Sequence, residues 1–128
     1  MNRSVSGKVY PETPFTVDPQ RVEAFRGVFE EPSGVPVTFA TAAEFSVMPR
    51  IIGDPELGLD FTRVLHGSQE YAFVRPLEEG ETLTVRARID AIRELGGNSF
   101  LTIVTDLVGS DGEVACTAKS TLIERDGG

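Results

Sequence analysis

The sequence predicts an α+β fold in which one long buried helix is wrapped by a curved antiparallel β-sheet. Two observations predict it: a helix-like segment that is apolar around nearly its whole circumference, and a following series of long alternating segments separated by turns. A helix that is apolar on all sides needs cover on all sides, which a curved sheet provides. Because 40% of the 128 residues are hydrophobic, a single domain is expected over residues 1–128.

The first part of the chain is expected to contain a short strand and a short amphipathic helix. The strand covers residues 14–18, and Asp18 is the predicted N-cap of the helix, with Pro19 at the first helical position. Apolar residues then recur at helical spacing as far as Phe29, which predicts a helix lying on an apolar surface. Residues 31–34 have the composition of a loop.

The buried helix is predicted at residues 38–48, with Thr38 as its N-cap. Apolar side chains surround most of its circumference, namely Phe39, Ala40, Ala42, Ala43, Phe45, Val47 and Met48. Pro49 is expected to end or kink this helix at about Met48, because proline lacks the N–H that the next helical hydrogen bond needs.

Four long strands are predicted after this helix. The first covers residues 66–75, and the second, residues 83–91, alternates between apolar and polar side chains throughout. The third, residues 100–108, is apolar on both faces and is therefore expected at the centre of the sheet. The fourth covers residues 113–124, and its predicted inward-facing set is Val114, Cys116, Ala118 and Leu122. This order of elements is the layout of the hot-dog fold.

Charge and composition argue against several classes of partner. The formal net charge is −8 and no stripe of Lys or Arg is present, so neither nucleic acid nor a membrane surface is expected to bind. With one cysteine and one histidine the chain has no metal-site spacing, and no metal or other cofactor is expected. No apolar stretch approaches the ~20 residues of a membrane span, and the first residues lack a signal-type apolar segment, so a cytoplasmic location is expected.

Three motifs carry a resemblance to a known family. Residues 66–80 read His-Gly-x-Gln-x-Tyr, then Arg-Pro, then Gly; residues 7–10 read Gly-x-x-Tyr; and residues 35–39 read Val-Pro-Val-Thr-Phe. These motifs and the strands after them resemble the MaoC-like (3R)-hydroxyacyl thioester dehydratases, and in particular their N-terminal, UPF-type non-catalytic subunit. The resemblance covers most of the chain and implies the hot-dog fold.

The resemblance also implies a reaction, the loss or addition of water across an acyl thioester. In the family an Asp and a His move the proton, and backbone N–H groups at the start of the buried helix, here about residues 39–41, polarise the thioester carbonyl. The Asp–His segment should precede that helix. Residues 30–34 read only Glu-Glu-Pro-Ser-Gly and contain no histidine, so the isolated chain is expected to lack hydro-lyase activity.

The same resemblance implies a binding role. The ligand is an acyl thioester of CoA or of acyl carrier protein, and the expected substrate-binding residues are Thr38, Phe39, Ala40, Thr41, Phe45, His66 and Gly67. The chain is expected to bind the acyl group and to form a homodimer, or a heterodimer with a catalytic hot-dog subunit that supplies the Asp and the His. A stand-alone binder of acyl chains or other hydrophobic ligands is an alternative.

Two side chains are the remaining candidates for chemistry. His66 is the only histidine and suits acid–base work near neutral pH, but its place at a strand start favours a structural role. Glu44 lies where hot-dog thioesterases carry an acidic residue, so an acyl thioesterase is a second alternative. A buried carboxylate on an apolar helix is costly unless it is functional or paired. The structural alternatives are that Glu44 faces a gap in the sheet, pairs with an arginine, or forms a capping box with Thr41.

Two further features have simpler interpretations. Arg86, Arg88 and Arg93 are interpreted as a solvated strand face, with contact to CoA phosphates as the alternative. Cys116 falls in the inward set of the last strand and is interpreted as an unreactive core residue.

Overall fold

The computed structural model describes residues 1–18, 20 and 39–125. The helix predicted after Asp18 lies almost entirely outside these residues, as does the predicted N-cap Thr38. At the start of that segment, the Gln20 backbone N–H donates to Asp18 Oδ1 over 2.9 Å. This is the contact expected of an N-cap aspartate.

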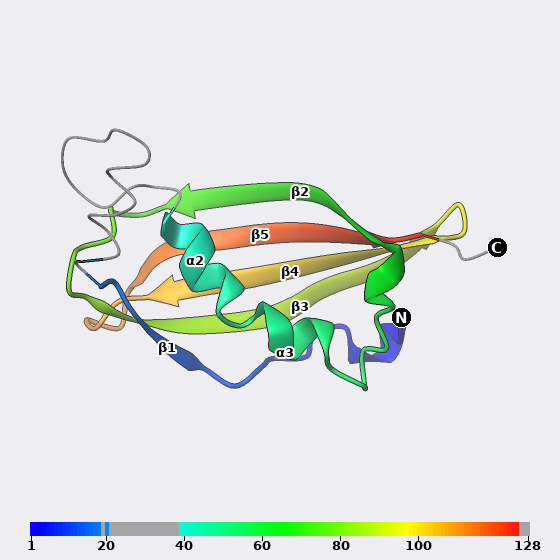
Figure 1. Cartoon of the computed structure of the whole chain (residues 1–128), viewed down its shortest axis with the longest axis horizontal. Helices are drawn as coiled ribbons and strands as arrows, with labels where there is room; N and C mark the ends of the chain where they lie inside the picture. Colours follow the sequence, from blue (N-terminus) through cyan, green and yellow to red (C-terminus); the bar gives the residue numbers. More distant parts are fainter. Residues whose placement is uncertain (19, 21–38, 126–128) are drawn as a thin grey trace.

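Five antiparallel strands form one sheet in the order β1-β3-β4-β5-β2 (Figure 1). The strands are β1 (Thr13–Thr16), β2 (Val64–Phe73), β3 (Thr82–Leu95), β4 (Asn98–Val108) and β5 (Val114–Glu124). The predicted strands are therefore present with small shifts at their ends. β4 is the central strand, as its two apolar faces predict.

The predicted buried helix is divided into two short helices, α2 (Phe39–Phe45) and α3 (Met48–Ile52). The helix was expected to end or kink at about Met48, and the break lies just before this residue, between Phe45 and Met48. There Ser46 donates both its backbone N–H and its hydroxyl to the Ala43 carbonyl. The chain then resumes as α3, with Pro49 in its first turn, where a backbone N–H has no helical partner and proline is tolerated.

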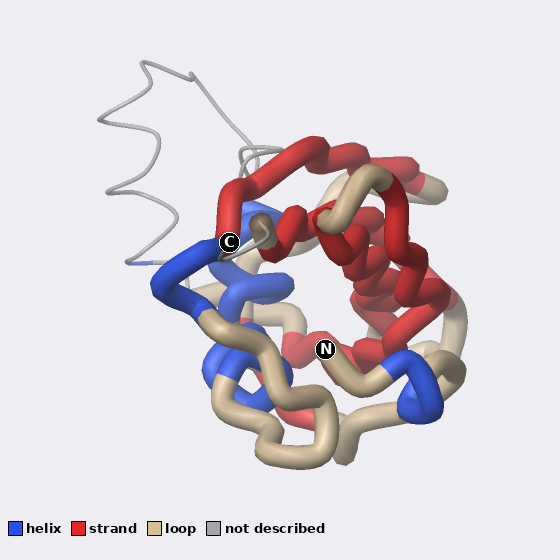
Figure 2. The backbone as a smooth tube through the Cα atoms, turned by 90° about the vertical axis from the view of Figure 1, so that its right-hand side faces the viewer, coloured by secondary structure: helices blue, strands red, loops and turns tan. Residues whose placement is uncertain are grey.

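The helices lie against the concave face of the sheet, which curves around them (Figures 1 and 2). Ala40 and Ala43 are fully buried, and their small side chains allow α2 to approach β4 and β5 closely. The core between the two layers also contains Ile51, Leu57, Leu83, Val85, Ile89, Leu101, Ile103 and Leu107. One helical layer enclosed by a curved antiparallel sheet is the hot-dog fold, as predicted.

Two short 3₁₀ helices, η1 (Arg3–Val5) and η2 (Phe61–Arg63), were not predicted. Each begins after a polar residue whose side chain accepts a backbone N–H, Asn2 for η1 and Asp60 for η2. Within the residues that the structure describes, no helix is long and apolar enough to cross a membrane.

Candidate functional site

The motif at the start of β2 places three polar side chains on the inner face of the sheet. His66 lies opposite Leu122, Gln69 opposite Ser120, and Tyr71 opposite Ala118. These partners belong to the inward-facing row of β5. In a regular strand, residues three apart point to opposite faces. A β-bulge between His66 and Ser68 adds one residue, so that His66 and Gln69 face the same way.

Gly67 is the extra residue of this bulge. A Cβ at this position would lie 2.9 Å from Ile123 Cδ1 and 3.3 Å from the Thr121 carbonyl oxygen on the neighbouring strand β5. Any side chain would therefore push against β5 at the point where the strand bends. The glycine of the His-Gly motif is explained by this close approach.

Gln69 and Tyr71 bind a buried carboxylate on α2. Gln69 Nε2 donates to both oxygens of Glu44, over 3.0 and 3.1 Å, and the Tyr71 hydroxyl donates to Glu44 Oε1 over 3.0 Å. Thr41 Oγ1 lies 2.6 Å from the Tyr71 oxygen. Because the phenol has one proton, which it gives to Glu44, Thr41 is the donor in this contact. We call these four residues the Glu44 cluster.

The Glu44 cluster joins α2 to β2 and encloses its carboxylate. Glu44 is 0% exposed, and this burial raises the pKa of its carboxyl, against the hydrogen bonds from Gln69 and Tyr71 and the nearby charge of His66, which lower it. Burial also raises the pKa of Tyr71 to about 12. The carboxylate is held by an amide and a phenol, and Thr41 reaches it only through Tyr71. This enclosure disfavours attack by Glu44 on a thioester.

An apolar cavity of about 340 Å³ opens beside the Glu44 cluster. Its walls come from both helices, η2, β2 and β5, and its lining residues are Phe45, Met48, Ile52, Phe61, Val64, His66, Ser120 and Leu122. Phe45, Phe61 and His66 are exposed and so stand at the mouth, whereas Met48, Ser120 and Leu122 are buried. Apolar walls with a few polar groups are the usual form of a small-molecule site.

The polar part of the cavity wall is a contact between His66 and Ser120. His66 Nε2 and Ser120 Oγ are 3.1 Å apart. Ser120 is only 1% exposed and occupies the inward row of β5 between Ala118 and Leu122. Ser120 is not in the predicted inward-facing set, because that set contains only apolar side chains and cysteine. A serine at an inward position of an alternating strand is the signal that would have found it.

The predicted binding residues divide into several groups. Phe45 and His66 lie together in the cavity wall, whereas Ala40 is packed in the core and Thr41 belongs to the Glu44 cluster. Gly67 shapes the bulge beside His66. Two predicted members lie outside the described residues, Thr38 entirely and Phe39 in its side chain.

The remaining residues singled out in the sequence lie elsewhere. Cys116 is fully buried, and burial raises the pKa of its thiol to about 11, which agrees with an unreactive core residue. Arg86 pairs with Glu12 over 3.0 Å and Arg88 with Asp106 over 3.6 Å. Both arginines thus take part in ion pairs on the sheet surface.

The second half of the β2 motif forms a turn away from the cavity. Arg75 makes an ion pair with Glu81, which also accepts the Glu78 backbone N–H. Gly80 has a φ of +78°, a conformation that favours glycine, and its N–H donates to the Val17 carbonyl over 2.7 Å. The Arg-Pro and Gly of the motif therefore hold the turn into β3 against the end of β1.

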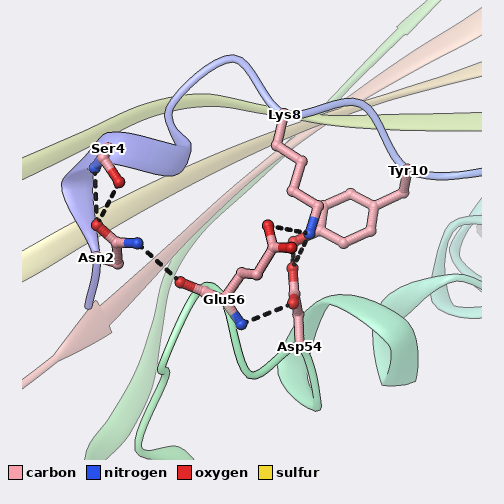
Figure 3. Close-up of polar contacts among 6 residues, drawn as sticks. All are labelled: Asn2, Ser4, Lys8, Tyr10, Asp54 and Glu56. Atoms are coloured by element: carbon pink, nitrogen blue, oxygen red, sulfur yellow. Dashed lines mark hydrogen bonds and ion pairs between the residues drawn. The ribbon is translucent and has the colours of Figure 1, made fainter.

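A second polar cluster lies where the chain leaves α3 (Figure 3). Asp54 Oδ2 accepts hydrogen bonds from Lys8 Nζ over 2.7 Å and from the Tyr10 hydroxyl over 2.8 Å, and Glu56 Oε2 lies 3.1 Å from Lys8 Nζ. The Lys8 ammonium is also 5.2 Å from the centre of the Tyr10 ring. These four residues, which we call the Lys8 cluster, include the tyrosine of the Gly-x-x-Tyr motif. They fix the N-terminal segment to the turn after α3.

Comparison with known proteins identifies relatives over nearly the whole chain. Residues 12–118 match the family described as FAS1-like, dehydratase domain region. A UPF0336 protein of Saccharopolyspora erythraea is 34% identical, over 98% of this chain and 92% of its own length. A UPF0336 protein of Thermobifida fusca is 31% identical, over 98% of this chain and 94% of its own length.

Solved structures with the same fold include hydroxyacyl dehydratases. The C-terminally truncated HadBC (3R-hydroxyacyl-ACP dehydratase) complex of Mycobacterium tuberculosis has a TM-score of 0.81 at 19% identity, covering 96% of this chain and 99% of the matched chain. A MaoC-like dehydratase has a TM-score of 0.84 at 18% identity, covering 99% of this chain and 44% of the other. At these identities the likeness establishes the hot-dog fold.

Proposed function

Because the chain belongs to the FAS1-like dehydratase domain region family and is related to the UPF0336 proteins, we propose that it binds an acyl thioester as the non-catalytic half of a two-part (R)-3-hydroxyacyl thioester dehydratase. The partner is a hot-dog subunit that supplies the catalytic Asp and His. In this proposal residues 1–128 act as one domain that holds the acyl group, and the thioester is carried by CoA or by acyl carrier protein.

The observation that carries this proposal is an apolar cavity beside which the described residues place no acid/base pair. The cavity is lined by six apolar side chains and by the pair His66 and Ser120. Dehydration needs groups that both remove and deliver a proton. His66 is the chain's only histidine, and the nearby carboxylate Glu44 is enclosed by Gln69 and Tyr71. As far as residues 1–18, 20 and 39–125 form it, the site is therefore suited to binding an acyl chain and contains no proton-transfer pair for the reaction.

The exposed edge of β2 supports a partner on this side of the sheet. β2 is ten residues long and stands at the end of the strand order, whereas the other edge strand, β1, has only four residues. A long open edge strand invites pairing with another chain. Leu65 is 50% exposed on β2, and Phe45 and Phe61 are 47% and 61% exposed at the adjacent cavity mouth. A second hot-dog subunit paired along β2 would cover these apolar side chains.

The proposal is tested by assaying the chain with and without its partner. The partner to express is a hot-dog protein that carries an Asp-x-Asn-Pro-x-His-type segment. We expect the purified chain alone to show no hydration of crotonyl or longer enoyl thioesters, and the co-purified pair to show it. Clear turnover by the isolated chain would contradict the non-catalytic role, and failure to form a complex with any such subunit would contradict the two-part enzyme.

A stand-alone acyl binder is the second candidate, and the cavity itself favours it. In that case the purified chain should retain an apolar ligand as a monomer or homodimer. Native mass spectrometry distinguishes the two proposals, since retained lipid in the isolated chain supports the second candidate and a mixed dimer supports the first.

A further inference from the structure

We infer that Ser120 binds an oxygen substituent on the chain of the ligand, so that the cavity distinguishes an oxygenated acyl chain from a plain one. This inference rests on the proposed acyl-binding function and names a specificity-determining residue within it. The first support is the position of Ser120. Burial of a hydroxyl in an apolar setting is costly unless its hydrogen bonds are made, and Ser120 lies between Ala118 and Leu122 in an inward row where aliphatic side chains pack.

The second support is hydrogen-bonding capacity that the protein leaves available at Ser120. A serine hydroxyl has one donor and two acceptor positions, and its partner among the described residues is His66 Nε2, at 3.1 Å. If Nε2 carries the proton, it donates to Ser120 and the serine proton is available to the ligand. If Nε2 is unprotonated, Ser120 donates to His66 and its lone pairs are available to the ligand.

The third support is the bulge, an independent feature of β2. Without the extra residue, His66 would not share a face with Gln69 and Tyr71. The bulge interrupts the hydrogen-bond ladder, and a Cβ at position 67 would displace the end of the Ile123 side chain. A polar residue in an apolar row of β5 and an irregularity in β2 thus bring the same two side chains together in the cavity wall.

These features favour one ligand chemistry. A hydroxyl group both donates and accepts, so it can bind Ser120 whichever way the His66–Ser120 contact is protonated, whereas a keto oxygen only accepts. The cavity volume of about 340 Å³ is a little over twice the ~150 Å³ of an apolar cavity that holds benzene, so it has room for about twelve carbon atoms. The inferred ligand is a medium-length acyl chain with a hydroxyl group that lies beside Ser120.

The test compares decanoic acid with its 3-hydroxy, 5-hydroxy and 10-hydroxy derivatives, using calorimetric titration of the purified chain. We expect at least one hydroxy acid to bind about threefold to tenfold more tightly than decanoic acid, the range for one net hydrogen bond. Ser120→Ala should remove this preference and leave the affinity for decanoic acid unchanged or higher. Thr121→Ala, on the opposite face of β5, is the matched control and should keep the preference.

The outcomes separate this inference from the proposed function. If decanoic acid and all three hydroxy acids bind equally, or if the preference survives Ser120→Ala, Ser120 does not read the ligand and the inference is overturned while acyl binding stands. If none of the four acids binds, nor the corresponding thioesters, the acyl-binding function fails first. His66→Asn keeps a side-chain donor and acceptor. It should therefore retain more of the preference for the hydroxy acid than His66→Ala does.

Discussion

Two polar clusters link the helical segment to the rest of the molecule, the Glu44 cluster around a buried carboxylate and the Lys8 cluster at a partly exposed site. The pKa values of their carboxyl groups are shifted in opposite directions. In the Glu44 cluster the carboxylate accepts hydrogen bonds from the neutral side chains Gln69 and Tyr71, and because Glu44 is fully buried its pKa is raised. In the Lys8 cluster, hydrogen bonds from the Lys8 ammonium and the Tyr10 hydroxyl lower the pKa of Asp54. The comparison shows that the partner and the solvent exposure, and not the carboxyl group itself, decide the direction of the shift.

The two directions predict opposite dependences of stability on pH. A raised pKa favours the protonated folded state, so the contribution of Glu44 is fully present below the ordinary glutamate pKa and is lost as pH rises through its raised value. A lowered pKa favours the ionised folded state, so the contribution of Asp54 is present above the ordinary aspartate pKa and is lost as pH falls through its lowered value. Acid should therefore weaken the Lys8 cluster, whereas the Glu44 contribution is lost as pH rises.

The largest expected effect comes from Gln69→Leu, which removes two of the three hydrogen bonds that Glu44 receives from the described residues. We expect the free energy of unfolding to fall by about 3 kcal/mol at pH 8, because the buried charge then keeps only the Tyr71 hydroxyl as a donor in the Glu44 cluster. The loss should be smaller at pH 5, where Glu44 can take up a proton. Urea unfolding at both pH values checks this, with Ser68→Ala on the exposed face of β2 as a control. An equal loss at both pH values would contradict the account of Glu44.

The next largest effect is expected from a matched pair of tyrosine substitutions. Tyr71→Phe and Tyr10→Phe each remove one hydroxyl that donates to a carboxylate. We expect a loss of about 2 kcal/mol for Tyr71→Phe, where Thr41 also loses its acceptor, and about 1 kcal/mol for Tyr10→Phe, where Asp54 keeps the lysine. Thermal and urea unfolding of the two variants measure the difference. The reverse order would show that burial is not the deciding factor.

A smaller effect is expected from Lys8→Met. The substitution removes the ammonium that lies between Asp54 and Glu56 but keeps a side chain of similar length. We expect less than half the loss caused by Tyr10→Phe in dilute buffer, and hardly any in 1 M NaCl, because salt screens partly exposed ion pairs. A salt-independent loss would mean that Lys8 acts through packing rather than charge.

The smallest change in stability is expected from Glu44→Gln. The amide keeps the shape of the carboxyl group. If the Gln69 amide turns over, its buried Oε1, which has no hydrogen-bond partner among the described residues, accepts from the new NH₂. The free energy of unfolding at pH 5 should hardly differ from that of the unchanged protein. The decrease in the free energy of unfolding between pH 5 and pH 8 should become smaller than in the unchanged protein, because the amide does not ionise. Unfolding curves across this range are the measurement, and an unchanged slope would assign the pH dependence to another group.

The sequence predicted the sheet well because alternation along a strand is a local property. The two apolar faces of residues 100–108 predicted the central position that β4 occupies. The helix was predicted in place but not in detail. Pro49 predicted an end or kink at about Met48, and the break between α2 and α3 lies just before that residue. The sequence did not predict that the chain resumes as a second helix with Pro49 in its first turn.

The candidate site could be predicted only in part. Phe45 and His66 were named from the resemblance, and both line the cavity. Ser120 was not predicted as a site residue, because a polar residue breaks the apolar pattern of the inward-facing row. Its role becomes visible only when its partner across the sheet, His66, is known. Gln69 and Tyr71 were visible in the motif but had no assigned role, since nothing in the linear order of residues places them against Glu44, which lies 25 residues before Gln69.

The sequence by itself determined the class of fold, which face of each strand is apolar, and the lack of an Asp–His segment before the buried helix. The tertiary structure decided which polar groups meet. For His66, this depends on the extra residue Gly67 in β2. The bulge places His66 on the same face of the sheet as Gln69 and Tyr71. A side-chain pattern of period two cannot reveal such a shift, because the register is set by pairing with β5 more than fifty residues away.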